Sequence, residues 1–355
     1  MKVLYLSAMH GVMEYDNCIT FEELGFDWFS TGIYNNPNHP IDYPGLNIRK
    51  PINKVVDTQA FDEFFLNNPN YYSQFVGLNR PEIKVSRKLV DMFDVVFCTY
   101  FKHIINNWEN LKHKPIIWRT SGSINEPMER EMKPYVDNGN IYPVRFSEQE
   151  LLSPISNGGT VIRNFVDENL YNSWGGNVLE ILTFQSWFTQ RRTLKINDFY
   201  LKHIYNKSNY SCRLYGAYVG AKDPISLGSV SWDKQRDLYR NCRVYFYIGS
   251  PVGVVAYNYM EAMMTGCPVV TFGPGVGGYH LQSINKVLHE PSEFIDNGVN
   301  GFYSDNPLEL KSIINSLMTN NSLSKKVSQE ARKSALKRFS KSKGIQAWKD
   351  FFNSL

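Results

Sequence analysis

Residues 250–278 read SPVGVVAYNYMEAMMTGCPVVTFGPGVGG and carry the densest pattern in the chain. Small residues from Gly253 to Ala256 follow a predicted strand end and open a predicted helix. A helix start presents backbone N–H groups and the positive end of the helix dipole, which together suit a phosphate. This stretch therefore predicts a phosphate-binding turn between a strand and a helix.

Glu261 lies about one and a half turns into that helix. It is the only acidic residue between Asp237 and Glu290. A carboxylate surrounded by methionine and alanine needs a partner, and its two oxygens would suit the diol of a sugar. Pairing with a nearby arginine, or capping of a backbone group, would satisfy it equally well, so both interpretations stay open.

A second stretch, FQSWFTQRRTLK at residues 184–195, places three cations after a predicted strand end. Open α/β sheets bind ligands there. Arg191 and Arg192 could contact phosphate in a bidentate manner and Lys195 as a point charge, although a solvated helical turn is the competing interpretation. Just past two other strand ends, His10 and Arg119 are candidates for contacting an acceptor, and a structural role remains open for both.

Short apolar strands alternate with helical patterns along both halves of the chain, which predicts βαβ units and parallel sheets. A polar, glycine-bearing linker at 172–177 interrupts the alternation. We therefore expect an α/β fold with two doubly wound, Rossmann-like domains facing a cleft. The predicted N-terminal domain spans 1–165 and the C-terminal domain 166–340, and a last helix within 341–355 could cross back to the N-terminal domain.

Composition narrows the class of protein. The 355 residues contain 43% hydrophobic residues, which is enough for packed cores, and no apolar run reaches the ~18 residues of a membrane-spanning helix. Five cysteines without a CxxC pair argue against a zinc ribbon or a disulfide framework and favour the cytoplasm, or the host cytoplasm for a viral protein.

The charge is divided unevenly between the halves. Residues 1–165 carry 16 Lys and Arg against 19 Asp and Glu, whereas residues 166–355 carry 22 against 15. A basic C-terminal half suits a phosphate-bearing ligand. The basic stretch 325–343 also fits a solvated helix face or contact with an anionic membrane surface.

Residues 178–355 resemble the GT-B glycosyltransferases, specifically the retaining, family-4-like group (glycosyltransferase group 1). The segment EAMMTGCPVV at 261–270 resembles that family's EAMAxGxPVV motif. The segment PSEFIDNGVNGF at 291–302 resembles a second motif about 30 residues later, and the order of the two is specific. The resemblance implies a GT-B fold and sugar transfer from a nucleotide-diphosphate sugar, with a UDP-sugar as the expected donor.

The resemblance also implies residue roles. Glu261 would bind the ribose hydroxyls, and Arg191, with Arg192 and Lys195 in reserve, would contact the donor diphosphate. Backbone N–H groups of Ala256 and Tyr257 would contact the phosphates, and Val230 would lie beside the base. Gly253 occupies the position of the family's first glutamate, which usually contacts the donor sugar, so the resemblance leaves the sugar open.

The leading hypothesis is thus a retaining, metal-independent glycosyltransferase in which Arg191 stabilises the leaving diphosphate and His10 contacts the acceptor. A glycan, a lipid-linked molecule or a small molecule could be that acceptor. The alternatives are a phage-type enzyme that glycosylates a hydroxymethylated pyrimidine in DNA, a non-catalytic nucleotide-sugar-binding protein, and an epimerase. The acidic N-terminal half argues against a broad DNA-binding face.

Overall fold

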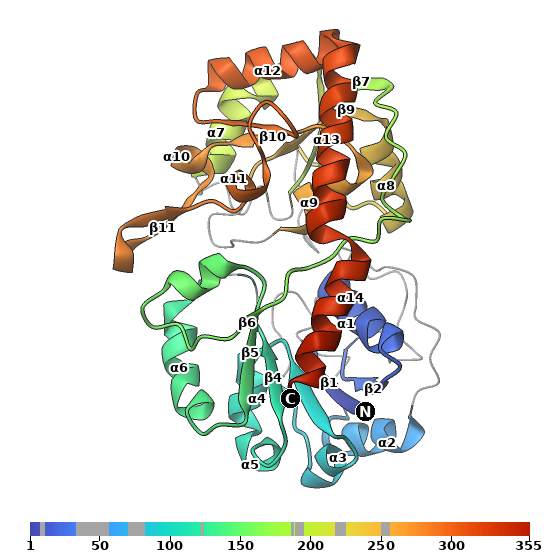
Figure 1. Cartoon of the computed structure of the whole chain (residues 1–355), viewed down its shortest axis with the longest axis vertical. Helices are drawn as coiled ribbons and strands as arrows, with labels where there is room; N and C mark the ends of the chain where they lie inside the picture. Colours follow the sequence, from blue (N-terminus) through green and yellow to red (C-terminus); the bar gives the residue numbers. More distant parts are fainter. Residues whose placement is uncertain are drawn as a thin grey trace. The chain divides into compact units, whose positions relative to one another are not determined.

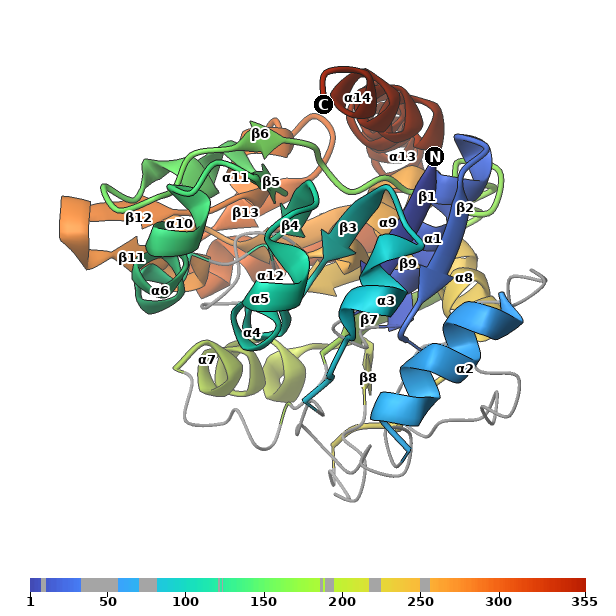
Figure 2. The same cartoon turned by 90° about the horizontal axis from the view of Figure 1, so that it is seen from below.

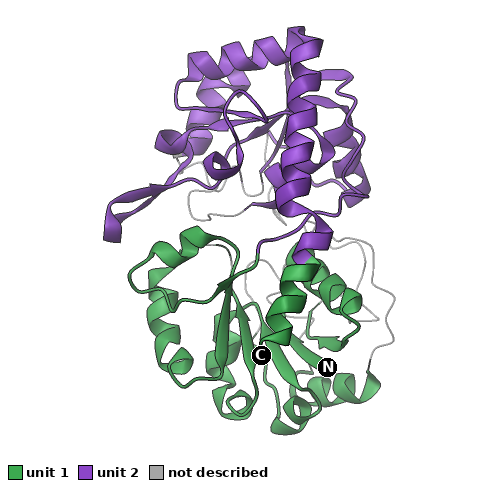
Figure 3. Cartoon of the chain, in the orientation of Figure 1, with its two compact units in different colours: residues 1–162, 345–355 green, residues 163–344 purple. Residues whose placement is uncertain are grey.

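A computed structural model divides the chain into two compact units (Figure 3). Unit 1 comprises Met1–Ile162 together with Ile345–Leu355, and unit 2 comprises Arg163–Gly344. The residues that the structure describes are 1–7, 11–32, 57–69, 82–120, 122, 124–185, 188, 195–216, 225–249 and 256–355. Each unit has its own parallel sheet and its own core.

Unit 1 is built on a six-stranded parallel sheet with the strand order β2-β1-β3-β4-β5-β6 (Figure 1). Its strands are β1 Lys2–Leu6, β2 Asp27–Ser30, β3 Val95–Cys98, β4 Ile116–Arg119, β5 Ile141–Arg145 and β6 Thr160–Val161. Its helices are α1 Gly11–Glu23, α2 Thr58–Asn67, α3 Arg87–Asp91, α4 Phe101–Asn106, α5 Trp108–Leu111, α6 Glu126–Val136 and the 3₁₀ helix η3 Glu148–Leu152. The strand order reverses between β1 and β3, which makes this sheet doubly wound.

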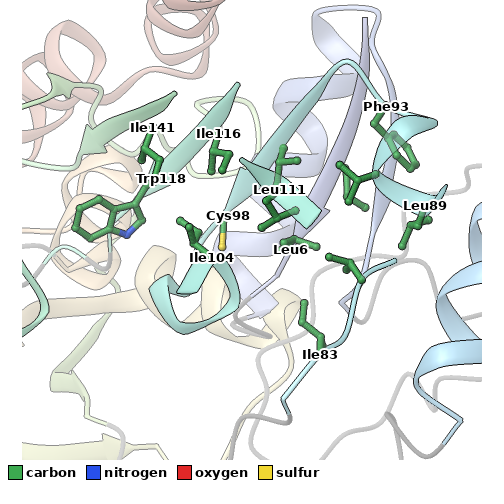
Figure 4. Close-up of a cluster of buried hydrophobic side chains, with 14 of the residues drawn as sticks. Leu6, Ile83, Leu89, Phe93, Cys98, Ile104, Leu111, Ile116, Trp118 and Ile141 are labelled. Atoms are coloured by element: carbon green, nitrogen blue, oxygen red, sulfur yellow. The ribbon is translucent and has the colours of Figure 1, made fainter. Parts of the chain in front are cut away.

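Apolar side chains cover both faces of this sheet, because successive residues of a strand point to opposite faces. Leu4 and Leu6 belong to one buried cluster, part of which Figure 4 shows. Val3 and Tyr5 belong to the cluster on the other face. The second cluster also contains aromatic side chains of the last helix, α14 Lys341–Asn353, namely Trp348, Phe351 and Phe352. The end of the chain therefore supplies part of the core of unit 1.

Unit 2 contains a five-stranded parallel sheet with the order β13-β10-β9-β7-β8. Its strands are β7 Val178–Phe184, β8 Ser211–Tyr215, β9 Cys242–Tyr247, β10 Val269–Phe272 and β13 Phe302–Ser304. Its helices are α7 Lys195–His203, α8 Trp232–Asn241, α9 Tyr257–Thr265, α10 Pro274–Gly277, α11 Pro291–Phe294, α12 Pro307–Thr319 and α13 Asn321–Phe339, with 3₁₀ turns η4 Tyr205–Lys207 and η5 Gln282–Ile284.

Unit 2 also carries an antiparallel hairpin, β11 Tyr279–Leu281 and β12 Lys286–Leu288 (Figure 2). Its main sheet reverses order between β7 and β9, so the switch point, where doubly wound sheets bind ligands, lies at the carboxyl ends of these two strands. Among the described residues of either unit, no helix has the length and apolarity needed to cross a membrane.

Helix α9 connects β9 to β10 and is fixed at its C-terminus by glycine. Gly266 caps the helix in the left-handed region, with φ of 91°. A Cβ atom at this position would lie 2.9 Å from the Ser328 hydroxyl on α13, which packs against α9. Only glycine combines this backbone conformation with so close an approach at low cost. The TG step of the 261–270 motif therefore has a structural role.

Candidate functional site

The switch point of unit 2 brings the start of α9 to the end of β7. Asn258 in the first turn of α9 donates from Nδ2 to the Phe184 carbonyl oxygen over 3.3 Å, and Phe184 is the last residue of β7. Ala256 is the N-cap of α9 in extended conformation, and its side chain makes no capping hydrogen bond. Tyr257 is the first helical residue and is half-buried. A helix start at this edge of the sheet suits an anion.

Glu261 follows Tyr257 by one helical turn and is buried, with 2% of its surface exposed. Tyr171 donates from its hydroxyl to Glu261 Oε1 over 2.8 Å, and Gln235 donates from Nε2 to Glu261 Oε2 over 3.1 Å. The Tyr239 hydroxyl lies 3.1 Å from the Asn258 carbonyl oxygen and 3.4 Å from Glu261 Oε2, and its single proton is shared between these two acceptors. These three side chains are neutral, and their hydrogen bonds orient the buried carboxylate.

The tyrosine beside Glu261 is held in its protonated form. Burial raises the pKa of Tyr239 well above its usual range, and the charges of Tyr245 and Glu261 raise it further. At neutral pH the Tyr239 hydroxyl therefore keeps its proton, which lies within reach of both the Asn258 carbonyl oxygen and the Glu261 carboxylate. The side chains around Glu261 thus present hydrogen-bond donors to its carboxylate.

Helix α8 supplies three side chains of this cluster, namely Trp232, Gln235 and Tyr239. The Ser231 hydroxyl caps the helix by accepting from the Lys234 N–H, which fixes where α8 begins. Trp232 and Gln235 are both buried and lie three residues apart, so they share one face of the helix. Val230 immediately precedes this cap and is half-buried, which brings the predicted base-side residue next to the helix that contacts Glu261.

Lys195 is the first residue of α7. Four of the sequence-predicted site residues lie outside the described residues: Arg191, Arg192, Gly253 and His10. The structure therefore brings Glu261 together with the start of α9 and with the segment that carries Val230.

Backbone N–H groups at the glycine-rich end of residues 250–278 have a partner within the protein. The Gly275 and Val276 N–H groups donate to the Asp305 carboxylate over 3.0 and 2.7 Å. An acidic side chain thus occupies the anion-binding turn that the glycines create. The phosphate signal in residues 250–278 consequently rests on the start of α9 and not on the glycines near 275.

Arg119, a candidate for acceptor contact, is buried in unit 1. Its Nη1 donates to the carbonyl oxygens of Arg145 and Ile162 over 2.9 and 2.6 Å, and its guanidinium lies 3.5 Å from the centre of the Phe146 ring. These contacts give Arg119 a structural role in joining β4, β5 and the segment after β6. Within the ranges that the structure describes, no group of three or more His, Cys, Asp or Glu side chains could hold a metal ion.

Sequence reasoning identified neither Tyr171 nor Gln235. Tyr171 precedes Glu261 by 90 residues, and it lies at the edge of a stretch interpreted as a linker. The one available signal was Gln235, a polar residue on the face of α8 that buries Trp232, Leu238 and Tyr239. A glutamine at such a position indicates a buried polar partner.

No family model matches the sequence, and no curated protein compared with it gives a match. Solved structures do match. HepE of Anabaena, in complex with UDP and glucose, is 14% identical with a TM-score of 0.66, over 100% of both chains. A glycosyltransferase from Rickettsia africae is 13% identical with a TM-score of 0.58, over 99% of this chain and 98% of that one.

A third similar structure is an alpha-glucosyltransferase in complex with UDP-glucose and DNA containing an abasic site. It is 10% identical with a TM-score of 0.58, over 99% of this chain and 98% of that chain. The predicted GT-B fold is confirmed. Identities this low show a common architecture, and function must be argued from the site.

Proposed function

We propose that this protein is a glycosyltransferase that moves a sugar from a nucleotide-diphosphate donor, expected to be a UDP-sugar, to a hydroxyl acceptor with retention. The observation that carries the proposal is the buried carboxylate of Glu261 on α9, the helix that follows β9. Tyr171 and Gln235 orient this carboxylate by hydrogen bonds. A carboxylate at the switch point of a doubly wound sheet suits a ribose diol. The GT-B fold shared with UDP-bound enzymes supports this assignment.

The proposed donor site has three further parts. The N–H groups at Ala256 and Tyr257 would contact the diphosphate, since a helix start favours negative charge. Arg191, assisted by Arg192 and Lys195, would stabilise the charge that develops on the leaving nucleoside diphosphate, without a metal ion. Val230 would lie beside the base. On the acceptor side, we assign His10 to contact the acceptor hydroxyl.

The first experiment measures donor binding. Thermal unfolding and isothermal titration with UDP, GDP, ADP and dTDP, alone and as sugar conjugates, identify the nucleotide, because a tight ligand raises the melting temperature. We expect UDP to give the largest shift. Glu261→Gln should weaken UDP binding, and Lys207→Ala, which removes an exposed cation of the same unit, should leave it unchanged.

The second experiment tests catalysis. Arg191→Ala should lower kcat/KM for sugar transfer by about 100-fold or more, since removing one transition-state donor typically costs that much. An unchanged rate in Arg191→Ala would refute its assignment. Donor binding without transfer to any acceptor tested would favour the non-catalytic alternative, which Gly253 motivates.

Transfer to a hydroxymethylated pyrimidine in DNA is a second candidate function. The observation that favours it is the structural similarity to the alpha-glucosyltransferase solved with DNA. Labelled UDP-glucose should then transfer label to a duplex containing hydroxymethylcytosine and not to the unmodified duplex. Binding of the duplex should also weaken steeply with salt, and no duplex binding at low salt would dismiss this candidate.

We also propose a reducing compartment, the cytoplasm or the host cytoplasm for a viral protein, as the site of action. None of the five cysteines forms a disulfide, which suits such a compartment. A lipid-linked acceptor would bring the protein to a membrane surface, and the basic stretch 325–343 would favour that contact. Co-sedimentation with anionic liposomes, compared with neutral ones, tests this part.

A further inference from the structure

The hydroxyl of Tyr171 lies between two polar side chains of unit 2. It is 2.8 Å from Trp232 Nε1 and 2.8 Å from Glu261 Oε1. Tyr171 is 1% exposed. Its hydroxyl thus forms both hydrogen bonds away from bulk water.

Chemistry fixes the direction of these two hydrogen bonds. An indole N–H can only donate, so the Tyr171 oxygen must accept from Trp232. The single hydroxyl proton of Tyr171 is then directed to Glu261 Oε1, the acceptor on its other side. The order Trp232 to Tyr171 to Glu261 follows from the donor capacities alone, and each bond polarises the next.

The backbone around Tyr171 is anchored by two arginines. Arg332 on α13 donates from Nη1 to the Tyr171 carbonyl oxygen over 2.7 Å. Arg240 on α8 donates to the carbonyl oxygens of Leu170 and Asn172 over 2.9 and 3.1 Å. The Tyr171 side chain is therefore presented by a fixed segment, although the sequence there resembles a linker.

The second carboxylate oxygen is held from a different side. Gln235 donates to Oε2 from α8, one helical turn after Trp232. The terminal torsion of a glutamate is broad and intrinsically loose. Donors on both oxygens restrict that torsion, and they set the plane in which the carboxylate meets a ligand.

We propose that Tyr171 is a positioning residue for Glu261 and that, with Trp232 behind it, it sets how strongly the protein distinguishes a ribonucleotide from its 2′-deoxy form. This inference rests on the proposed function, in which Glu261 binds the ribose diol of the donor. Tyr171 does not touch the ligand in this scheme. It acts by holding the carboxylate in the orientation that the two hydroxyls require.

The test compares the affinities of the full-length protein for UDP and for 2′-deoxy-UDP. Wild type should bind UDP about 10-fold or more tightly than 2′-deoxy-UDP, since the deoxy form lacks one of the two hydroxyls that would donate to the buried carboxylate. Glu261→Gln should bring that ratio close to one. Tyr171→Phe should reduce it by about 3- to 10-fold, the net contribution of one typical intramolecular hydrogen bond.

The matched control is Tyr259→Phe. Tyr259 is also a buried tyrosine on a buried glutamate, with its hydroxyl 2.9 Å from Glu290 Oε2. Both variants lose one tyrosine–carboxylate bond, so a purely structural role predicts similar losses of thermal stability and an unchanged UDP to 2′-deoxy-UDP ratio in both. The positioning role predicts that the ratio falls only in Tyr171→Phe.

A second variant keeps the test decisive if Tyr171→Phe folds poorly. Trp232→Phe leaves the Tyr171 hydroxyl in place and removes the donor behind it, so it should reduce the ratio by a smaller factor. An unchanged ratio in folded Tyr171→Phe, or in Trp232→Phe where the first variant does not fold, overturns the positioning role.

The proposed function fails in a different way. A wild-type protein that binds no UDP, or binds UDP and 2′-deoxy-UDP equally, contradicts the assignment of Glu261 to the ribose and the inference with it. Loss of the ratio in Glu261→Gln with no change in Tyr171→Phe leaves the proposed function standing and overturns only the positioning role.

Discussion

Buried His289 should make the stability of unit 2 depend on pH. The imidazole is 7% exposed and its Nδ1 has no hydrogen-bond partner among the described residues. Burial lowers the pKa of His289 to about 4, although the Asp305 carboxylate and the Phe272 carbonyl oppose the shift. A Cβ atom on Gly277 would lie 3.3 Å from Nε2, so the protein packs closely around the ring.

The sign follows from comparing the two states. The unfolded chain protonates His289 near pH 6.5, whereas the folded chain resists protonation until about pH 4. Above pH 6.5 both states are neutral and the contribution is constant. As the pH falls from 6.5 to 4, the unfolded state gains a proton that the folded state excludes, and the free energy of unfolding decreases by about 1.4 kcal/mol per pH unit, or about 3 kcal/mol in total.

Urea unfolding at pH 7.5 and pH 5.5 measures this effect. Over that interval, His289 should lower the free energy of unfolding by about 1.3 kcal/mol. Other groups also titrate, so the informative quantity is the difference between wild type and His289→Gln at each pH. The difference in free energy of unfolding between wild type and His289→Gln should be smaller at pH 5.5 than at pH 7.5, because only wild type loses the stability that the neutral His289 contributes. The control His280→Gln removes an exposed imidazole. A constant difference between wild type and His289→Gln would refute the reasoning.

Three further predictions concern the fold. Trp348→Ala should lower the free energy of unfolding of unit 1 by about 3–5 kcal/mol, because it removes a buried aromatic side chain. Calorimetry should show unfolding at a lower temperature in this variant. The control Lys349→Ala, which changes an exposed neighbour, should leave the unfolding temperature unchanged. Gly266→Ala should lower the free energy of unfolding by about 1–2 kcal/mol or more, because alanine must then adopt a left-handed backbone conformation. Equal melting temperatures of wild type and Gly266→Ala would contradict this prediction. Burial raises the pKa of Cys98 to about 12, so its thiol should react with Ellman's reagent at pH 8 only after unfolding; rapid reaction in the native protein would disagree.

Much of the fold could be predicted because its strands are buried on both faces. Strands such as Val95–Cys98 are continuous apolar runs, a pattern that indicates a parallel sheet covered by helices. The first helix shows where the pattern fails. The sequence pattern by itself predicts a short helix over 18–24, closed by Gly25, whereas α1 spans Gly11–Glu23. Glu14, in its first turn, is fully buried and accepts from the Ser7 and Ser30 hydroxyls, so a polar network and not an apolar stripe holds that turn.

The candidate site could be predicted only in part. Glu261 was identifiable as an isolated acid in an apolar helix, because a buried carboxylate needs partners. The identity of those partners was not encoded locally. Tyr171 reaches Glu261 across 90 residues of sequence, and only the doubly wound order of the strands brings the two together.

The two motifs that suggested the family contribute differently. In the second motif, Asn300 accepts from the Asp296 N–H over 2.8 Å and donates to the Phe294 carbonyl over 2.9 Å. Gly298 in the same turn has φ of 83°, which favours glycine. These two hydrogen bonds close a loop before β13, and neither of them reaches a residue of the Glu261 cluster. The second motif is therefore evidence for the fold, and Glu261 in the first motif carries the functional argument.

Substituting Asn300 by alanine should accordingly lower the melting temperature and leave the ratio of the affinities for UDP and 2′-deoxy-UDP unchanged in the folded fraction. A changed affinity ratio would mean that the loop takes part in donor binding.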